Sequence, residues 1–293
     1  MPLEPGQLLD PPVNRAAYSD RSAWIMARCS ELAYVPFENG PAQMQQLRDS
    51  LKDLRLELLA PFQVEATTGY VAKSQRYAVL AFRGTTKDMR NILTDINVRF
   101  YRDPQTNAKI AAGFGQAFAL VKSDISAAIS QIDRGLPLYI TGHSLGGALA
   151  VIASARIEPS DRVAACYTFG CPRVGTAEFA DELWKVPVYR LVHSADIVPR
   201  VPPPFGYRHA GDMRYIKRNG KMMQGPNSVG LFFSFAYTFA TGWKNVFLDH
   251  RIANYTSNLQ AWALKRLDLE QDSTSPQAPA QSKTLAASPG ATR

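Results

Sequence analysis

A tight turn between a predicted strand and a predicted helix constrains this chain more than any other feature. Leu136–Thr141 is a short apolar run typical of a buried strand, and Leu145–Ile157 is rich in Ala and Leu, which favours a helix. Residues 142–147 between them have the sequence GHSLGG, a Gly-x-Ser-x-Gly pattern. With a strand before it and a helix after it, this pattern predicts a strained turn that holds Ser144 exposed above the end of a sheet, as a nucleophile.

Strand-like and helix-like segments alternate along the rest of the chain. Apolar residues at helical spacing predict helices at Asp20–Tyr34, Gln43–Leu51, Phe114–Ile132 and Asn254–Leu267. Short apolar runs predict buried strands at Tyr77–Phe82, Val163–Phe169 and Val188–Val192. This alternation predicts an α/β fold, with a mainly parallel sheet covered by helices on both faces.

The composition is that of a globular protein, and it argues against metal or disulfide chemistry. With 46% hydrophobic and 20% charged residues, the chain is neither collagen-like, nor a coiled coil, nor wholly disordered. We expect one domain over residues 1–270 and a disordered tail over 271–293, because the tail is dominated by Ser, Pro, Ala, Gln and Thr. The three cysteines (Cys29, Cys166 and Cys171) form no zinc-site spacing and cannot all pair, so we expect no metal and no cofactor.

Neither a secretory leader nor a membrane-spanning helix is predicted. The first six residues are acidic and rich in proline, unlike the basic start of a leader. The uncharged stretch between Lys221 and Lys244 is interrupted by Gln224–Ser228, and the remaining residues 229–243 fall short of the ~20 that a span needs. We therefore expect a cytoplasmic or membrane-peripheral protein, or one exported without a leader.

A serine nucleophile needs a histidine base, which in this architecture follows the serine in the chain. The chain has four histidines. His143 precedes Ser144 and is expected to pack beside the turn. His250 follows a long irregular segment and begins the final helical stretch, so it is the predicted base. His209 is the second choice, because residues 205–216 alternate like a strand and favour a structural role.

Asp196 is the predicted acid that orients the base. It follows the buried strand Val188–Val192 directly, which places it at the catalytic edge of an open α/β sheet. Asp212 and Asp249 are competitors, but Asp249 adjoins His250, and neighbouring residues rarely orient one another.

Two residues are candidates for binding the oxyanion of an acyl-transfer reaction. Leu145 begins the helix after Ser144, so its N–H group is free and lies at the positive end of the helix dipole. Thr85 follows the predicted strand Tyr77–Phe82, where a second donor is expected, and offers both an N–H group and a hydroxyl. The alternative for Thr85 is a simple cap on the segment after it.

Taken together, these motifs resemble the class 3 (fungal-type) lipase family of α/β-hydrolases, over roughly Tyr18–Leu267. The matching stretches are Phe82–Thr85 with Asp95 downstream, Gly142–Gly147, Thr168–Gly175, Asp196 with Val198–Pro203, and more loosely His250–Tyr255. The resemblance implies an α/β-hydrolase fold, a triad of Ser144, Asp196 and His250, and an oxyanion hole of Thr85 and Leu145. The chain departs from the family at Ala111, where many members carry a histidine.

The resemblance also implies a lid over the site. That segment is Thr86–Phe100, in which Met89, Ile92, Leu93 and Ile96 lie at helical spacing. The spacing suits an amphipathic lid helix, and it equally suits a helix that packs in the core.

The net charge of +8 is concentrated in one segment. Arg200–Lys221 carries six cations against Asp212, and the aromatic-rich segment Gly230–Phe239 follows. A basic stretch beside an aromatic one favours peripheral contact with an anionic lipid interface. The alternative is a solvated strand edge followed by a buried insertion. No helix-turn-helix, RNP or zinc-finger pattern accompanies the charge, so we expect no nucleic-acid partner.

These features predict a serine carboxylic-ester hydrolase, which we expect to be a lipase that cleaves acylglycerol esters through an acyl-enzyme. The alternatives are a phospholipase or a carboxylesterase on other acyl esters. A non-catalytic lipid-surface binding module is less favoured, because such a module has no need of a complete triad. Acyl chain length, regiospecificity and oligomeric state stay open at this level.

Overall fold

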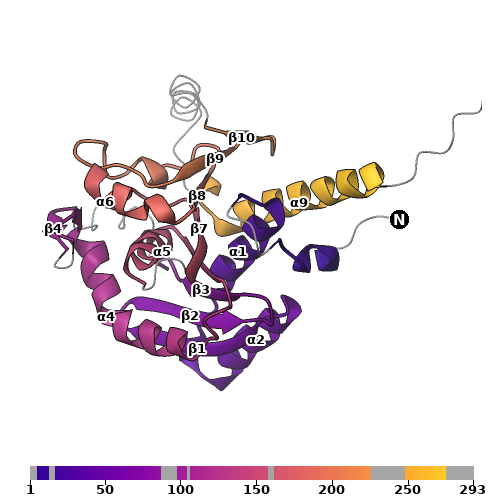
Figure 1. Cartoon of the computed structure of the whole chain (residues 1–293), viewed down its shortest axis with the longest axis horizontal. Helices are drawn as coiled ribbons and strands as arrows, with labels where there is room; N and C mark the ends of the chain where they lie inside the picture. The colour runs from indigo at the N-terminus through magenta and orange to yellow at the C-terminus, as the bar shows by residue number, and fades with distance from the viewer. Residues whose placement is uncertain are drawn as a thin grey trace, which may run out of the picture.

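An eight-stranded sheet runs through the protein in the order β1-β2-β3-β6-β7-β8-β9-β10 (Figure 1). The computed structural model describes residues 5–12, 17–86, 98–103, 106–157, 162–225 and 248–274. Neighbouring strands from β3 to β9 pair in parallel, whereas β1, β2 and β10 pair antiparallel to their neighbours. The strands are β1 (Glu57–Val64), β2 (Thr67–Lys73), β3 (Ala78–Phe82), β6 (Leu138–His143), β7 (Val163–Phe169), β8 (Val188–His193), β9 (Asp212–Ile216) and β10 (Met222–Gln224).

Helices cover both faces of this sheet, as Figure 1 shows. One face is covered by α4 (Ala112–Ser130), α5 (Leu145–Arg156) and α6 (Ala177–Glu182). The other is covered by α1 (Asp20–Leu32), α2 (Pro41–Asp53) and α9 (Ile252–Thr274), with α1 and α9 packed against each other. The prediction of a mainly parallel sheet between two helical layers is therefore confirmed.

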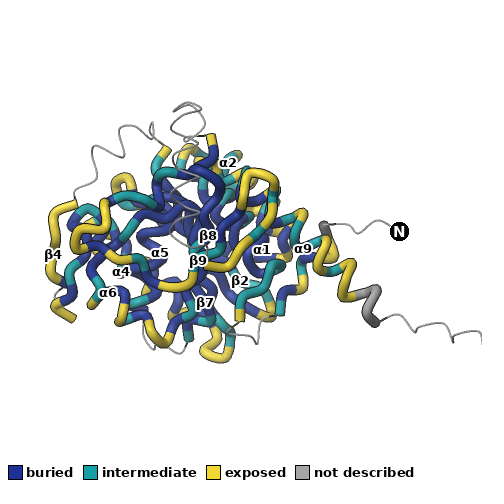
Figure 2. The backbone as a smooth tube through the Cα atoms, turned by 90° about the horizontal axis from the view of Figure 1, so that it is seen from above, coloured by how far each residue is buried: buried dark blue, intermediate teal, exposed yellow. Residues whose placement is uncertain are grey.

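The central strands are buried on both sides, which explains their continuous apolar sequences. All residues of β3 and β6 are buried. Successive residues of β6 alternate between the two cores: Leu138 and Ile140 pack toward α4 and α5, and Tyr139 packs toward α1. Viewed from above, the buried residues fill the middle of the molecule, around α5, β8 and α1, and the exposed residues lie mostly at its rim (Figure 2).

The predicted helices and central strands agree with the structure to within a few residues, except at the end of the last helix. That helix, α9, continues to Thr274, four residues past the predicted end of the domain, and the rest of the predicted tail lies outside the described residues. The hairpin of β1 and β2 was not predicted. The strand-like segment 205–216 forms a strand only from Asp212 onward.

Two predicted features fall largely outside the described residues. They are the candidate lid helix, for which residues 87–97 are not described, and the aromatic segment 230–239. A short second sheet follows the first of these gaps and pairs β4 (Phe100–Arg102) with β5 (Lys109–Ala111). Within the described ranges, no helix combines the length and apolar character needed to cross a bilayer.

Candidate active site

Ser144 lies at the turn between β6 and α5, in a backbone conformation that non-glycine residues rarely adopt. Its φ is 58° and its ψ is −127°. Such a conformation costs of order 1–3 kcal/mol and persists only where the surroundings impose it. Here the Ser144 N–H group donates to the carbonyl of Phe169 on β7 at 2.9 Å. The side chain is 2% exposed, and its Oγ has no hydrogen-bond partner among the described residues.

Glycines on both sides of Ser144 make this turn possible. A β-carbon on Gly142 would lie 2.1 Å from the carbonyl oxygen of Gly146. One on Gly146 would lie 2.4 Å from the carbonyl oxygen of Phe82 on β3. Both distances are shorter than any contact a real β-carbon makes, so the Gly-x-Ser-x-Gly pattern is required by the close approach of β6, α5 and β3.

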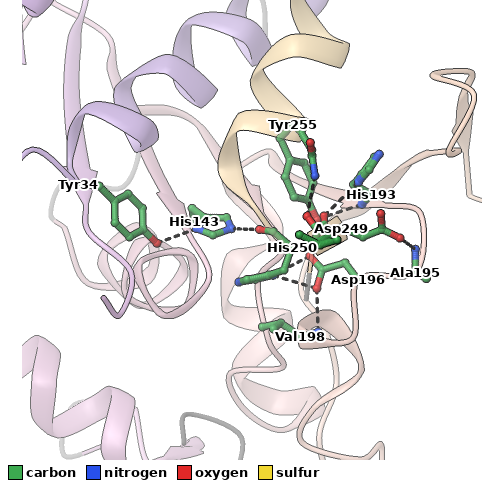
Figure 3. Close-up of polar contacts among 11 residues, drawn as sticks. Tyr34, His143, His193, Ala195, Asp196, Val198, Asp249, His250 and Tyr255 are labelled. Atoms are coloured by element: carbon green, nitrogen blue, oxygen red, sulfur yellow. Dashed lines mark hydrogen bonds and ion pairs between the residues drawn. The ribbon is translucent and has the colours of Figure 1, made fainter. Parts of the chain in front are cut away.

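Asp196 and His250 form a buried hydrogen-bonded pair at the same edge of the sheet (Figure 3). Asp196 follows β8 and is fully buried, and the His250 Nδ1–H group donates to its carboxylate at 2.8 and 2.9 Å. The Tyr255 hydroxyl donates to Oδ2 at 2.6 Å, and the Val198 N–H group donates to Oδ1 at 2.9 Å. Burial raises the pKa of Asp196, but the charge of His250 and these hydrogen bonds outweigh it, and the pKa lies below its usual value.

This pairing leaves the other ring nitrogen of His250 available as a base. Because Nδ1 carries the hydrogen, a neutral ring has its lone pair on Nε2, and this atom is buried with no partner in the described part of the chain. Gly170 provides the space for the pair: a β-carbon there would lie 2.6 Å from Asp196 Oδ2 and 2.8 Å from the His250 ring. Ser144 Oγ and His250 Nε2 are thus the two buried polar atoms of the site that remain open to a reacting group.

The competing candidates have other contacts. Asp249 Oδ2 accepts the Ala195 N–H group at 3.1 Å and pairs with Arg218 at 3.2 Å, so it does not orient His250. Asp212 is exposed at the start of β9. His209 Nε2 lies 2.7 Å from the carbonyl oxygen of Pro199, and burial lowers the pKa of His209 well below its usual value. These contacts agree with the structural role expected for His209.

The two predicted oxyanion residues belong to two segments that meet at Ser144. Leu145 is the first residue of α5, so its N–H group belongs to the first turn, where no carbonyl of the same helix is available. Thr85 follows β3 and is half-buried, and the preceding Gly84 lies so close to the turn that a β-carbon on it would be 3.2 Å from Ser144 Cβ. A salt bridge of 2.6 Å between Arg83 and Glu38 ties the start of this loop to the segment after α1.

Several further side chains surround the pair, and the sequence predicted for them only that His143 packs beside the turn. His143 Nε2 lies 2.6 Å from the carbonyl oxygen of His250, and the Tyr34 hydroxyl lies 2.7 Å from His143 Nδ1. His193 Nδ1 lies 3.0 Å from the carbonyl oxygen of Asp249. Among the others, only Tyr255 had a signal in the sequence, through the loose match of the segment that begins at His250.

The basic stretch Arg200–Lys221 does not form one continuous patch. Arg208 pairs with Asp181, and the Arg214 guanidinium lies 4.8 Å from the centre of the Tyr18 ring. Lys217 and Lys221 are exposed in the turn between β9 and β10. Because β9 is parallel to β8 and Ile216 pairs with His193, this turn lies at the edge of the sheet that carries the site.

Comparisons with known proteins agree with this geometry. A family model described as "Lipase (class 3)" matches residues 79–206, a range that includes Ser144 and Asp196 but neither His250 nor Tyr34. A lipase of Rhizopus niveus is 39% identical over 173 residues, which cover 54% of this chain and 44% of the relative. The chain therefore spans less than half the length of that relative.

Solved structures extend the similarity to the fold. The structure of lipase II from Rhizopus niveus is 30% identical, with a TM-score of 0.58 over 68% of this chain and 80% of the other. A second structure is 26% identical, with a TM-score of 0.61 over 72% of this chain and 85% of the other. Its description states that a serine protease triad forms the catalytic centre of a triacylglycerol lipase.

Proposed function

The chain belongs to the class 3 lipase family of α/β-hydrolases, and from this premise we propose that it is a serine carboxylic-ester hydrolase that cleaves acylglycerol esters. The observation that carries the proposal is the buried Asp196–His250 pair, which lies at the same sheet edge as the strained turn of Ser144. Among the described residues, the His250 Nε2 atom and the Ser144 hydroxyl have no hydrogen-bond partner. A binding module has no use for two such groups at one sheet edge, because each costs free energy when it is buried.

In the proposed first half-reaction, Ser144 Oγ attacks the acyl carbonyl carbon as its proton moves to His250 Nε2. Asp196 accepts the hydrogen bond from Nδ1 and stabilises the imidazolium that forms. The N–H groups of Leu145 and Thr85 bind the negative oxygen of the tetrahedral intermediate. The carbon–oxygen bond to the alcohol then breaks, and His250 returns its proton to the departing alkoxide.

The second half-reaction repeats these steps with water. The ester between Ser144 and the acyl group is attacked by a water molecule, whose proton His250 accepts. Collapse of the second tetrahedral intermediate releases the fatty acid, and the proton returns to Ser144 Oγ. Each oxyanion donor is expected to contribute about 2.7–4 kcal/mol to the stabilisation of both intermediates.

Hydrolysis of p-nitrophenyl butyrate and p-nitrophenyl palmitate tests the proposal. Ser144→Ala should lower kcat by up to about 10⁶-fold. Ser154→Ala is the matched control, because Ser154 is a buried serine of α5 whose hydroxyl donates to Ala150 within the helix. Equal turnover by Ser144→Ala and the wild type would contradict the proposal.

The substrate class is tested with natural lipids. Faster release of fatty acid from emulsified triolein than from dissolved tributyrin is expected of a lipase, whereas the reverse preference would indicate an esterase. Cleavage of phosphatidylcholine in place of triolein would move the assignment to a phospholipase.

We also infer that the protein docks on an anionic lipid interface through the turn between β9 and β10. The support is the exposure of Lys217 and Lys221 at the edge of the sheet that carries the site. Each lysine near a negative membrane surface contributes about 1 kcal/mol to binding. The bound molecule would present the edge of the sheet that carries Ser144 to the lipid.

Vesicle co-sedimentation tests this docking surface. Lys217→Gln/Lys221→Gln should weaken binding to vesicles of phosphatidylcholine and phosphatidylserine. Arg48→Gln/Lys52→Gln is the matched control, because both side chains are exposed on α2, at the opposite end of the sheet. Equal binding by the two double variants would exclude the turn as the docking surface.

A further inference from the structure

Two histidines other than His250 bind the backbone of the loop that carries it. His143 Nε2 lies 2.6 Å from the carbonyl oxygen of His250, and His193 Nδ1 lies 3.0 Å from the carbonyl oxygen of Asp249. A carbonyl oxygen only accepts, so each imidazole carries its hydrogen on the nitrogen that faces the loop. Two consecutive peptide carbonyls are therefore each bound by a side-chain donor (Figure 3).

Both donors come from rigid parts of the fold. His143 is the last residue of β6 and His193 is the last residue of β8, and their exposed fractions are 5% and 6%. Parallel strands end at the same edge of a sheet, so these side chains reach the loop from that edge, with only β7 between their strands. The loop of Asp249 and His250 is thus fixed to the strands that lead to Ser144 and Asp196.

Tyr34 fixes the tautomer of His143. Because His143 Nε2 carries the hydrogen, Nδ1 is an acceptor, and the Tyr34 hydroxyl donates to it at 2.7 Å. Burial and the neighbouring charge of His250 lower the pKa of His143 to about 3, so the ring is neutral at ordinary pH. The His143 and His250 rings lie 4.4 Å apart, which adds a packing contact to the hydrogen bond.

The same hydroxyl lies against the loop that leads to Thr85. A β-carbon on Gly84 would be 2.1 Å from it, and a hydrogen bond with the Gly84 backbone partly offsets the effect of burial, which raises the pKa of Tyr34. The hydrogen bonds therefore run from Gly84 through Tyr34 and His143 to the carbonyl of His250. One connected set joins the loop on the oxyanion side of the site to the loop on the base side.

We propose that His143 and His193 are positioning residues, hydrogen-bond donors that fix the main chain at His250 and Asp249 so that the His250 imidazole is held in line with Ser144. Tyr34 contributes to the same positioning, because it holds His143 in the tautomer that donates to the loop. The inference rests on the proposed ester hydrolysis through Ser144. It assigns the three residues no contact with substrate.

Variants that keep or remove the donor separate positioning from packing. His143→Gln and His193→Asn place an amide N–H group near the position of the original donor nitrogen, whereas His143→Leu and His193→Leu remove the donor. A displacement of ~1 Å at a reacting group costs about 100-fold in rate, so we expect each leucine variant to lose about 10- to 100-fold in kcat. The KM for p-nitrophenyl butyrate should change little, and the amide variants should recover most of kcat.

Tyr34→Phe tests the link through His143. It should lower kcat less than His143→Leu does, because the bond from His143 to the loop can persist without it. Tyr70→Phe is the matched control, since it removes another buried hydroxyl that donates to a carbonyl, that of Cys29, at 2.8 Å and away from the site. Equal loss of kcat in the two phenylalanine variants would show that Tyr34 has no part in positioning His250.

A readout that needs no substrate separates this inference from the proposed function. The His250 Nδ1 proton, bound to Asp196, should give a strongly downfield proton NMR signal in the wild type, and His143→Leu and His193→Leu should shift or broaden it. If the leucine variants change this signal but the wild type does not hydrolyse esters, the proposed function alone would be contradicted. Leucine variants with unchanged signal and unchanged kcat would overturn the positioning role, as would equal losses in the leucine and amide variants.

Discussion

The two halves of the site are built in opposite ways. The turn that carries Ser144 is made by residues 142–147, and its geometry follows from glycines within two or three positions of the serine. The loop that carries His250 is held by partners far away in the sequence, with separations of 54 residues to Asp196 and 107 residues to His143. The position of Ser144 is thus set by residues close to it in the sequence, and the position of His250 is set by tertiary contacts.

This difference predicts two kinds of failure. An atom added at the turn meets backbone that cannot move, so a single substitution there should cause a large loss of stability and of kcat. The loss of one contact at the loop leaves the others in place, so kcat should fall less the further the lost contact lies from the His250 imidazole. The variants below follow this scale, from the largest expected effect to the smallest.

Asp196→Asn should have the largest effect of the four. The amide cannot stabilise the imidazolium and favours the wrong tautomer of His250, so kcat should fall by about 10⁴-fold. Asp212→Asn is the control, an exposed acid at the start of β9. Steady-state hydrolysis of p-nitrophenyl butyrate measures both. A drop of similar size in the two variants would show that the loss of a negative charge, rather than the loss of the bond to His250, sets the rate.

Gly142→Ala tests the local half of the comparison. Its β-carbon would lie 2.1 Å from the Gly146 carbonyl oxygen, and relief of that clash should cost about 1–3 kcal/mol of unfolding free energy and displace Ser144. Gly135→Ala would meet only the carboxylate oxygen of Asp133, at an ordinary contact distance of 3.4 Å, and should change stability by less than about 0.5 kcal/mol. Urea denaturation and kcat give the two readouts. An active, fully stable Gly142→Ala protein would contradict the proposed constraint.

His143→Gln should change how stability depends on pH. The pKa of His143 is about 3 in the folded protein, against the ordinary value of 6.5 expected in the unfolded chain. Between these two pH values, the unfolded chain binds a proton at this residue and the folded chain does not. Stability therefore falls as the pH drops from 6.5 toward 3, by up to about 1.4 kcal/mol per pH unit from this group. Denaturation curves at several pH values should show a shallower fall in His143→Gln. His209 acts in the same direction in both proteins, so its contribution cancels, and parallel curves would refute the assignment.

Arg218→Gln should have the smallest effect. Arg218 pairs with Asp249 at 3.2 Å but its side chain is 52% exposed, and exposed ion pairs contribute about 0–1 kcal/mol. The Ala195 N–H group still holds Asp249, so kcat should stay close to that of the wild type. Thermal unfolding and turnover check both points. A large fall in kcat would mean that this ion pair, rather than the two histidines, fixes the loop.

The contrast also explains how far the sequence could be interpreted. The turn at Ser144 was predictable because a strand, a glycine pair and a helix are consecutive in the chain. The central strands were predictable because burial on both faces leaves unbroken apolar runs. The β1–β2 hairpin was not predictable in this way. Apolar and polar residues alternate only partly in β1, and Pro61 interrupts the pattern of an ordinary strand.

The surroundings of the base were predictable only in part. Chain order and position after a strand favoured Asp196 and His250, and the structure brings the two together. Nothing near Tyr34, His143 or His193 in the sequence indicates that the two histidines bind one loop or that Tyr34 binds His143. These contacts cross 107 residues from His143 to His250, 56 from His193 to Asp249 and 109 from Tyr34 to His143. Such contacts follow from sheet order, which single-sequence patterns do not encode.

The packing of α1 against α9 has a consequence for how the protein is made. The core on that face combines residues from the first third of the chain with Tyr255, Leu259 and Ala263 from its last helix. A ribosome delivers these residues of α9 after all the other buried members of this core, and His250 lies just before α9 in the chain. The nascent chain therefore cannot fix the loop of His250 before α9 arrives to complete this core.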